Sequence, residues 1–528
     1  MKTHALRTPG AADRLSYLWL ALAFVLSLFA LNGTWDIALA AWLYPLFLLR
    51  FVRTKRPAIA IPGAFLVNVG ATGIYFHQVG FPLSLISLVE IVILASFPTL
   101  PYLIDRLVSP SIRGLVSTLI FPLSFVAADY LKSLASPFGG IGSLAYTQYG
   151  NLPLLQLLSV TGISGIVFLL TWFGSVINWA WEQHFTWPRI RKGILLYSIL
   201  LALVLFGGGA RLAFFQPQAQ TVRVAGISFS QAVDTQAFKS AGNTLTASMS
   251  GKATQADLET IRRAFAMIDN DLLARSQREA SAGAKIVAWP ECGAEILQED
   301  KPTLLAQATQ LAQKTHIYLD MGLCVLSRQA PHVQDQAILI DPQGQVLWTY
   351  NKARPVPGLD PLVPGNGVVP TVNTAYGRIS NVICFDGDFP YLSRQAGQAQ
   401  ADLMLIPSND WRAIDPWHTQ DITFRAIENG FSLVRQTSHG LAIAVDYDGR
   451  VLASSDYFAT GEQVMIASVP VKGVQTIYAL VGDLFAQLCM VALLILVAFA
   501  LVQSYRQRTG RNTVADETAP VPEPHLVG

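Results

Sequence analysis

The sequence predicts a membrane-spanning helical bundle joined to a layered α/β domain. Of its 528 residues, 52% are hydrophobic and only 14% are charged, which is too apolar a balance for an ordinary soluble enzyme. Long apolar runs fill the first 214 residues and recur near the C-terminus, whereas the part between them is mixed in pattern. We expect residues 1–214 to form a transmembrane domain of about seven helices. Residues 215–475 are then a water-facing domain, residues 476–504 a last transmembrane helix and residues 505–528 a disordered cytoplasmic tail.

Each predicted membrane helix is an apolar run. The runs are Leu15–Leu31, Ile37–Phe51, Ala58–Phe76, Leu83–Ile104, Leu115–Leu131, Leu154–Trp181, Leu195–Phe214 and, after the water-facing domain, Tyr478–Val502. Some are shorter than the roughly 20 residues that cross a bilayer, so we expect tilted helices. The first run lacks a small-residue cleavage site and is too long for a removable signal peptide.

Basic residues predict the orientation of the bundle, because positive charge concentrates in cytoplasmic connections. They cluster at the N-terminus, after the second, fourth and sixth runs, and in the tail: Lys2, Arg7, Arg14, Arg50, Arg53, Lys55, Arg56, Arg106, Arg113, Arg189, Arg191, Lys192, Arg506, Arg508 and Arg511. The alternate connections are nearly free of positive charge, and one carries only Lys132. The sequence therefore places both termini in the cytoplasm and the large domain outside.

The connection from Ser133 to Pro153 is rich in glycine and aromatic residues, and it lies on the same side as the large domain. One interpretation is an interfacial loop anchored by its aromatic side chains. The other is a re-entrant floor beneath an active site, where lipid could enter. Asp129 lies near the outer end of the preceding helix, where an acid is usually paired or functional.

Strands and helices alternate in the large domain, which indicates a layered α/β arrangement with mixed sheets. The expected strands are Val222–Ile227, Lys285–Ala288, Ile317–Leu323, Ile379–Ile383, Leu403–Ile406, Ser432–Gln436, Ala442–Tyr447 and Val451–Ser454, with a hairpin at Asp341–Gly344. The expected helices are Leu258–Arg275, Leu304–Lys314, Leu392–Ala399 and Asp421–Asn429.

Three chemically useful side chains each follow a predicted strand: Glu291, Lys352 and Cys384. A thiol accepts an acyl group if a base removes its proton, and a carboxylate in a partly apolar site can be that base. A lysine ammonium, helped by the backbone N–H of Phe385, can stabilise the resulting oxyanion. Each residue alone also has an ordinary interpretation, as a buried structural thiol, a strand-end cap and a surface charge. Their joint occurrence at strand ends favours catalysis.

These motifs resemble those of the nitrilase, or carbon–nitrogen hydrolase, superfamily. The matching segments are Pro290-Glu291, Tyr350-Asn351-Lys352, Ile383-Cys384-Phe385-Asp386, Gly377-Arg378-Ile379, Phe389-Pro390, Ala401-Asp402, Pro407-Ser408-Asn409-Asp410-Trp411 and Arg425-Ala426-Ile427-Glu428. The resemblance covers roughly residues 221–470 and implies an αββα sandwich with a Glu-Lys-Cys triad. With seven spans before this domain and one after it, the chain is similar to the apolipoprotein N-acyltransferase family.

The family resemblance implies a bacterial cytoplasmic-membrane enzyme whose catalytic domain is extracytoplasmic. Cys384 would take an acyl chain from a phospholipid as a thioester and pass it to the amine of a diacylglyceryl-cysteine lipoprotein. Glu291 would be base and then acid, and Lys352 would hold the oxyanion. Asp360 falls where the family usually has a second glutamate, and Cys384-Phe385-Asp386 replaces its usual Cys-Tyr-Glu. The second departure is closer to soluble nitrilase-type amidases.

Other residues complete the expected site. Trp411, Tyr146 and Gln148 are candidate substrate contacts, whereas His418 and His439 are expected to be structural. The spacing of Cys292, Cys324, Cys384 and Cys489 matches no zinc pattern and no disulfide framework. We expect no cofactor and no metal, a monomer, and, from a net charge of only +2, no nucleic-acid partner. Two alternatives are a membrane-anchored amidase that uses water as acceptor and a catalytically silent receptor or scaffold.

Overall fold

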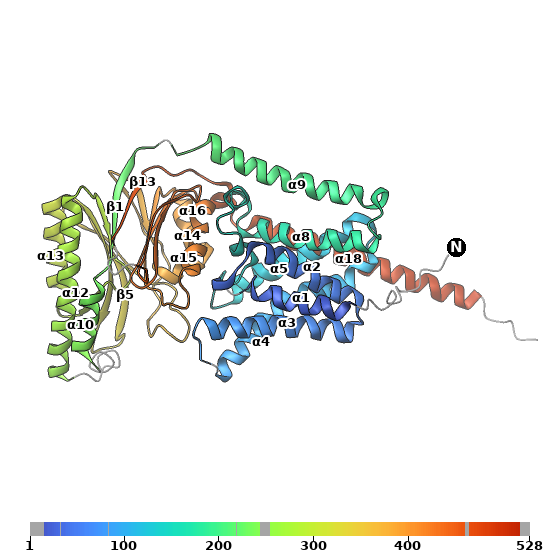
Figure 1. The fold of residues 1–528 in the computed structure, drawn as a ribbon, viewed down its shortest axis with the longest axis horizontal. Coiled ribbons are helices and arrows are strands. Elements are labelled where there is room, and N and C mark those ends of the chain that lie inside the picture. The colour runs from blue at the N-terminus through green and yellow to red at the C-terminus, as the bar shows by residue number, and fades with distance from the viewer. Residues whose placement is uncertain are drawn as a thin grey trace, which may run out of the picture.

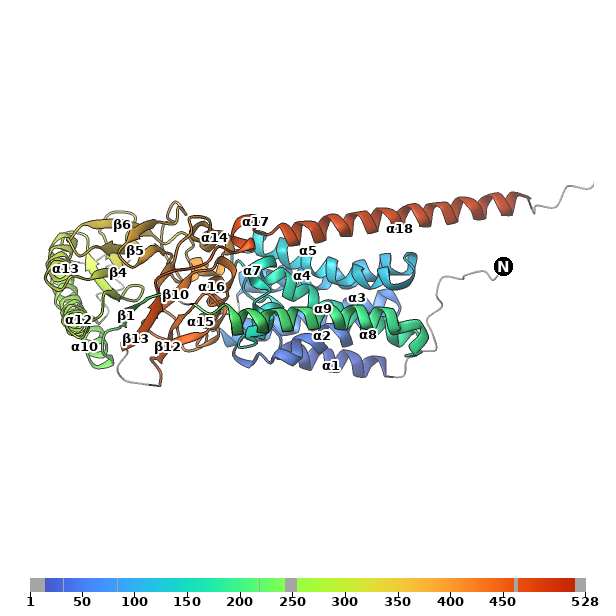
Figure 2. The ribbon, with the colours of Figure 1, turned by 90° about the horizontal axis from the view of Figure 1, so that it is seen from above.

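The computed structural model describes residues 15–31, 33–82, 84–217, 219–242, 254–459 and 464–517, with side chains described up to residue 506. Its long axis runs from a β-sheet sandwich at one end to a bundle of roughly parallel helices at the other (Figure 1). The N-terminal end and the far end of the last helix both lie at the end of the bundle remote from the sheets (Figures 1 and 2). The basic residues Lys2, Arg7 and Arg14, counted in the predicted orientation, lie outside the described residues.

Eight helices build the bundle within the described chain. They are α1 (Ser16–Leu28), α2 (Ala38–Thr54), α3 (Pro57–Gln78), α4 (Leu85–Val108), α5 (Ile120–Ala135), α8 (Ile163–Glu182), α9 (Trp187–Phe214) and α18 (Leu484–Glu517). In the described chain, six helical segments are long and apolar enough to cross a membrane. They contain α3, α4, α5, α8, α9 and α18. α1 and α2 have only 13 and 17 residues, so they fall short of a straight span.

Short helical elements connect the long helices at the end of the bundle that faces the sheets. They are η1 (Gly33–Trp35), η4 (Leu144–Gln148), α6 (Leu152–Leu155) and α7 (Leu158–Thr161), with η2 (Ser109–Ser111) and η3 (Gly114–Leu119) elsewhere in the bundle. The last helix extends further than expected. α18 continues to Glu517, so residues 505–517 are helical instead of disordered, because a helix that the apolar span has already nucleated can be extended at little cost per added residue. Residues 518–528 of the expected tail lie outside the described residues.

The strands of the described chain form two sheets. The first has the order β13-β1-β2-β4-β5-β6, with β3 also paired to β4, and the second has the order β12-β11-β10-β9-β8-β7. The strands are β1 (Thr221–Ile227), β2 (Ile286–Ala288), β3 (Ala294–Leu297), β4 (Tyr318–Leu326), β5 (Val333–Ile340), β6 (Val346–Asn351), β7 (Thr371–Thr374), β8 (Gly377–Asn381), β9 (Leu403–Ser408), β10 (Ser432–Thr437), β11 (Leu441–Val445), β12 (Val451–Asp456) and β13 (Val464–Pro470).

The sheets pack face to face with a helical layer on each outer side, as an αββα sandwich. An apolar core between them joins Val224 and Leu339 of the first sheet to Leu405 and Val434 of the second. The outer layers are α10 (Gln231–Ala241), α12 (Gln255–Ser281) and α13 (Lys301–Thr315) on one side, and α14 (Pro390–Gln398), α15 (Trp417–Ile422) and α16 (Phe424–Asn429) on the other. The second layer lies between the sandwich and the bundle (Figure 1). The predicted fold class is confirmed.

Every strand and helix expected in this domain is present, although the helix expected at Asp421–Asn429 is broken into α15 and α16. The sequence did not predict α10, β3, β7 or β13. β3 and β7 have only four residues each, too few for a clear pattern of alternation. β13 becomes a strand through its antiparallel pairing with β1, a contact between the two ends of the domain.

Hydrogen bonds tie the sandwich to the bundle. The Gly140 N–H donates to the Asp388 carbonyl at 2.9 Å, and the Trp411 indole N–H donates to the Val79 carbonyl at 2.9 Å. α17 (Ile477–Val481) packs beside α14 and α7 as the chain returns to the bundle (Figure 2). The end of the sandwich that carries Cys384 is therefore held against the helices.

Candidate active site

Cys384 begins a single helical turn, η5 (Cys384–Asp388), shortly after β8. Its φ is +44°, in the left-handed region that a side chain with a Cβ rarely adopts. Such strain persists only where the surroundings impose it, and it clusters at functional sites. The thiol is thus turned out of the strand direction at the point where the strand ends.

Asp386 joins this turn to the segment that carries Lys352. Its carboxylate accepts hydrogen bonds from the backbone N–H groups of Ile383 at 3.2 Å and Arg354 at 2.7 Å, and from the Tyr350 hydroxyl at 2.8 Å. Ile383 directly precedes Cys384 in the chain, whereas Tyr350 and Arg354 lie on either side of Lys352. Asp386 therefore sets the spacing between the nucleophile and the lysine.

The Lys352 ammonium, which is buried, lies among three carboxylates. Its Nζ is 2.6 Å from Glu291 Oε1, 2.7 Å from Asp360 Oδ2 and 3.8 Å from Asp335 Oδ2. Burial by itself would lower the pKa of Lys352, but the surrounding negative charges, with Glu291 foremost, hold this pKa well above its usual range. Lys352 is therefore a permanent cation in the site.

The Cys384 sulfur lies 3.9 Å from the Asn409 carbonyl oxygen and 4.0 Å from Arg435 Nη2. Burial raises the pKa of the thiol well above its usual range, and the Glu291 carboxylate adds to this effect. The thiol is protonated at neutral pH, so it needs a base before it can attack. Among the neighbouring charges, Glu291 raises this pKa most, and its carboxylate lines the same cavity as the thiol.

A second buried network lies on the other side of the sulfur. Asp410 receives two hydrogen bonds from Arg435, at 2.8 and 2.9 Å, and one contact from His418 Nδ1 at 2.8 Å. His418 Nε2 lies 2.8 Å from Asp388. Burial opposes the charge on His418, yet Asp388 and Asp410 raise its pKa to about 9. This network fixes Arg435 against the nucleophile, and it holds His418, which also lines the cavity, between two carboxylates.

A cavity of about 510 Å³ contains the candidate residues. The residues that line it from the sandwich include Glu291, Lys352, Asp360, Cys384, Phe385 and Trp411. Its other walls come from the bundle and from the Ser133–Pro153 connection, and include Leu31, Tyr75, Phe76, Phe97, Phe125, Phe138 and Ile141. The connection therefore forms a floor of the site, in agreement with the second of the two interpretations given above.

Two of the expected substrate contacts do not line this cavity. The Tyr146 hydroxyl accepts a hydrogen bond from Arg425 Nη2 at 2.9 Å, and the Tyr146 ring packs on Phe424. Gln148 is buried, accepts from the Trp42 indole and donates to the Ala38 carbonyl. Tyr146 therefore joins η4 to α16, and Gln148 joins η4 to α2.

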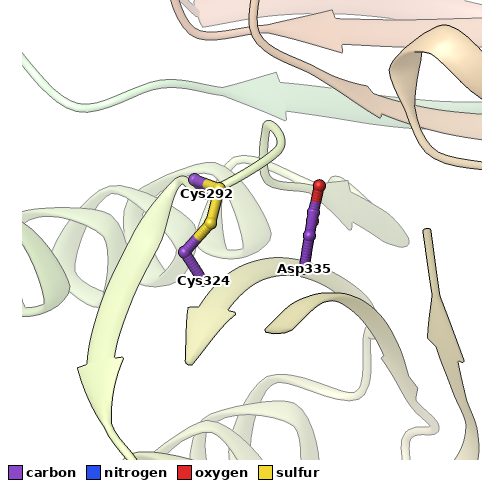
Figure 3. A group of neighbouring side chains, drawn as sticks. All are labelled: Cys292, Cys324 and Asp335. Atoms are coloured by element: carbon purple, nitrogen blue, oxygen red, sulfur yellow. A yellow bond between two sulfur atoms is a disulfide. The ribbon is translucent and has the colours of Figure 1, made fainter. Parts of the chain in front are cut away.

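Cys292 and Cys324 form a disulfide beside the site (Figure 3). This pairing corrects the expectation that the cysteines make no disulfide. The two residues are 32 positions apart. Cys292 lies between β2 and β3, and both of these strands pair with β4, which carries Cys324. Cys384 and Cys489 remain free.

Two groups of side chains in the described chain have metal-ligand spacing, Cys292 with Cys324 and Asp335, and Cys384 with Asp410 and His418. In the first group both sulfurs belong to the disulfide. In the second, Asp410 already binds Arg435. Neither group presents three free ligands.

Four residues of the site were not predicted as functional: Glu295, Asp335, Asp410 and Arg435. Glu295, Asp335 and Arg435 lie within strands, where the sequence does not indicate which face lines a cavity. Asp410 lies inside a motif quoted for the family resemblance, and that motif was the available signal.

Two family models match the chain. The apolipoprotein N-acyltransferase N-terminal domain matches residues 15–176, and the carbon-nitrogen hydrolase model matches residues 246–479. The chain is 26% identical over 428 residues to an apolipoprotein N-acyltransferase of Geobacter metallireducens, covering 74% of this chain and 75% of the relative. It is 24% identical over 443 residues to one of Bradyrhizobium diazoefficiens, covering 76% and 75%.

Among solved structures, Saccharomyces cerevisiae Nit3, a member of branch 10 of the nitrilase superfamily, matches with a TM-score of 0.38 and 19% identity. That match covers 48% of this chain and 90% of Nit3. The two family models match successive parts of one polypeptide, and each of the two named relatives aligns over about three quarters of the chain. The chain therefore belongs to the apolipoprotein N-acyltransferase family, a membrane-embedded branch of the nitrilase superfamily.

Proposed function

We propose that this protein transfers an acyl chain from a phospholipid to the N-terminal amine of a diacylglyceryl-cysteine lipoprotein, through a thioester on Cys384. One observation carries the proposal. A single cavity contains Glu291, Lys352 and Cys384 at one end and apolar side chains of the bundle at the other. An ester carbonyl can lie at the thiol while its acyl chain stays among apolar walls.

In the first half-reaction, Glu291 takes the Cys384 proton and the sulfur attacks the ester carbonyl. The Lys352 ammonium and the Phe385 backbone N–H stabilise the negative charge on the carbonyl oxygen. When the tetrahedral intermediate collapses, the C–O bond breaks and the leaving alkoxide takes the proton from Glu291. The products are a lysophospholipid and an acyl thioester on Cys384.

In the second half-reaction, a neutral α-amine attacks the thioester carbonyl, and Glu291 accepts one of its protons. The C–S bond breaks, the proton returns to the sulfur, and the acceptor leaves as an amide. Asp360, 2.7 Å from Lys352 Nζ, orients the ammonium through both steps. The Val356 backbone N–H donates to the same Asp360 oxygen at 2.9 Å, which keeps this carboxylate in place.

We propose that the protein is a monomer in the bacterial cytoplasmic membrane with the sandwich on the extracytoplasmic side. The basic ends of α2, α4 and α9 support this orientation, because they lie at the end of the bundle remote from the sandwich (Figure 2). Phospholipid and lipoprotein would both reach the cavity from the membrane.

Mass spectrometry of the purified protein tests the proposal. Incubation with phospholipid alone should add one acyl group to Cys384 and release lysophospholipid with little free fatty acid. A diacylated lipopeptide added afterwards should become triacylated, in amounts equal to the lysophospholipid. Cys384→Ala should abolish the adduct, whereas Cys489→Ala, which removes the other free cysteine, should leave it unchanged.

The competing function is hydrolysis, with water resolving the thioester. Rapid fatty-acid release that does not depend on the lipopeptide would establish that function instead. Turnover of simple soluble amides without lipid would do the same. An adduct on the Cys384→Ala variant would refute the assignment of the nucleophile.

A further inference from the structure

The Cys292–Cys324 disulfide stands next to the proposed general base. Cys292 follows Glu291 directly in the chain, and both cysteines line the cavity that contains Cys384. Figure 3 shows the bridge between the two side chains. The proposed reaction steps make no use of this bridge, so they do not explain its position inside the reaction cavity.

Glu291 lies in a short turn whose backbone is strained. The turn runs from residue 289 to residue 293, between β2 and β3. Within it, Cys292 has a φ of +48°, in the left-handed region that a side chain with a Cβ rarely adopts. Such a conformation persists only where its surroundings impose it. The Glu291 N–H donates to the Ser408 carbonyl only at 3.3 Å, whereas the disulfide restrains the turn covalently.

The bridge fastens this turn to the middle of a sheet. Cys324 lies in β4, where it pairs in register with Glu295 of β3 on one side and with Asp335 of β5 on the other. A strand bonded on both sides is among the most stable parts of a fold, whereas turns open more easily. The disulfide therefore holds the residue after Glu291 at a fixed place relative to β4.

The Glu291 carboxylate has little freedom to move if it is to act as the base. It is 5% exposed, and its Oε1 lies 2.6 Å from Lys352 Nζ in the cavity that Cys384 also lines. A base has to stay within hydrogen-bond reach of the proton that it takes, directly or through one water. A misplacement of about 1 Å can cost on the order of 10²-fold in rate. A shift of that size in the turn is enough to take the base out of position.

We infer that Cys292 and Cys324 are positioning residues, and that their disulfide holds Glu291 where it can take the proton of the thiol. The inference rests on the proposed function, in which Glu291 is the base. Activity then depends on the bridge being oxidised. A dithiol that reduces the bridge supplies two electrons and two protons: the S–S bond breaks, two thiols form, and the dithiol closes to a cyclic disulfide. The proposed extracytoplasmic location is one where such a bridge persists.

The test measures thioester formation on Cys384 in a single turnover, with phosphatidylglycerol as the donor. The wild type is used as purified, after reduction by dithiothreitol, and after reoxidation. Gel filtration removes the reductant before the donor is added, because thiols cleave thioesters. The double variant Cys292→Ser with Cys324→Ser lacks the bridge permanently, and Cys489→Ser, which changes a free cysteine that does not line the cavity, is the matched control. Alkylation followed by mass spectrometry reports the state of the bridge.

At pH 7, the reduced wild type and the double variant should form the thioester about tenfold more slowly than the oxidised wild type. The phospholipid concentration that gives half of the maximal rate should stay within about twofold, because the bridge acts on the reacting groups and not on lipid binding. Reoxidation should restore the rate of the wild type. The reductant should not change the double variant, and Cys489→Ser should match the wild type in both states.

The pH dependence separates a misplaced base from a general loss of structure. Burial above all, with the Glu291 and Asp410 charges, holds the pKa of Cys384 well above its usual range, against the opposing effects of Lys352 and Arg435. Without a positioned base, attack relies on the small thiolate fraction, which grows about tenfold per pH unit. The deficit of the double variant should therefore shrink at least about threefold between pH 7 and pH 8.5.

The inference is overturned if the reduced wild type and the double variant keep the oxidised rate, or if their deficit is the same at both pH values. It is also overturned if alkylation shows no bridge in the purified protein. Unfolding on loss of the bridge, followed by tryptophan fluorescence, would overturn it too, because the disulfide would then be a structural cross-link alone. An oxidised wild type that forms no thioester would instead refute the proposed function, so the two failures are distinguishable.

Discussion

Replacement of Lys352 by methionine should destabilise the protein in a pH-dependent way. The side chain keeps its length and apolar stem, but the ammonium that lies 2.6 Å from Glu291 and 2.7 Å from Asp360 is lost. Removing one member of a buried ion pair costs roughly 3–5 kcal/mol. A loss of about 1 kcal/mol lowers the Tm of a domain of this size by about 2–4 °C. We therefore expect the apparent Tm to fall by at least about 6 °C at pH 8.

The sign of the pH effect follows from the carboxylates that remain. Burial and the Glu291 charge raise the pKa of Asp335 well above its usual range, and Lys352 opposes that rise. Without Lys352 the folded-state pKa of Asp335 lies further above its unfolded value, so the native state of the variant holds a proton that the unfolded state releases. Stability of that kind is present at low pH and is lost as pH rises through the raised pKa values. The difference in Tm between wild type and Lys352→Met should therefore be small at pH 5 and large at pH 8.

Thermal unfolding in detergent, followed by tryptophan fluorescence, measures this difference. The double variant Lys352→Met with Asp360→Asn is the control, because it removes one of the uncompensated charges and should recover part of the lost Tm at pH 8. A deficit of the same size at pH 5 and pH 8 would refute the view that Lys352 neutralises buried carboxylates. So would a double variant less stable than the single one.

Two further predictions concern His418 and the orientation of the chain. Because Asp388 and Asp410 raise the pKa of His418 to about 9, its contribution to stability is complete below pH ~6.5 and is lost as pH rises toward 9. His418→Gln should therefore lower the Tm of the protein at pH 6 and change it much less at pH 9.5; an equal loss at both values would contradict the charged state. A reporter active only outside the cytoplasm should function when fused after Gln216, and one active only inside should function after Arg508. The opposite pattern would exclude the proposed lipoprotein substrate.

The sequence indicated those candidate residues that stand directly after a strand. Glu291, Lys352 and Cys384 follow strands, and strand ends can be recognised from short apolar runs and turn residues. Glu295 and Asp335 could not be found in this way, because the face of a strand that lines a cavity depends on its partners. The register that places both beside Cys324 is a property of the folded sheet.

The same limit explains the corrections to the cysteine pairing and to Tyr146. The Cys292–Cys324 disulfide depends on the pairing of β2 and β3 with β4, and these two strands have only three and four residues. Tyr146 lies in an aromatic loop that was expected to face substrate. Its hydroxyl instead accepts a hydrogen bond from the buried Arg425 of the sandwich. Contacts between the sandwich and the bundle are long-range, so local sequence patterns do not indicate which loop residues face the cavity and which face the interface.

Two features of the proposed site would favour an amine over water as the group that resolves the thioester: access from the membrane and apolar cavity walls. An α-amine with a pKa near roughly 8 is already partly neutral at pH 7, and anchoring in the same membrane holds it at high effective concentration. The apolar walls from the bundle exclude water from one side of the cavity. The Gly140 to Asp388 hydrogen bond keeps the floor of the cavity in contact with the turn that begins at Cys384. A hydrolase of small soluble amides would gain nothing from this contact between the bundle and the turn that carries Cys384. An enzyme whose donor and acceptor both enter from the membrane requires the nucleophile to keep a fixed position relative to the bundle.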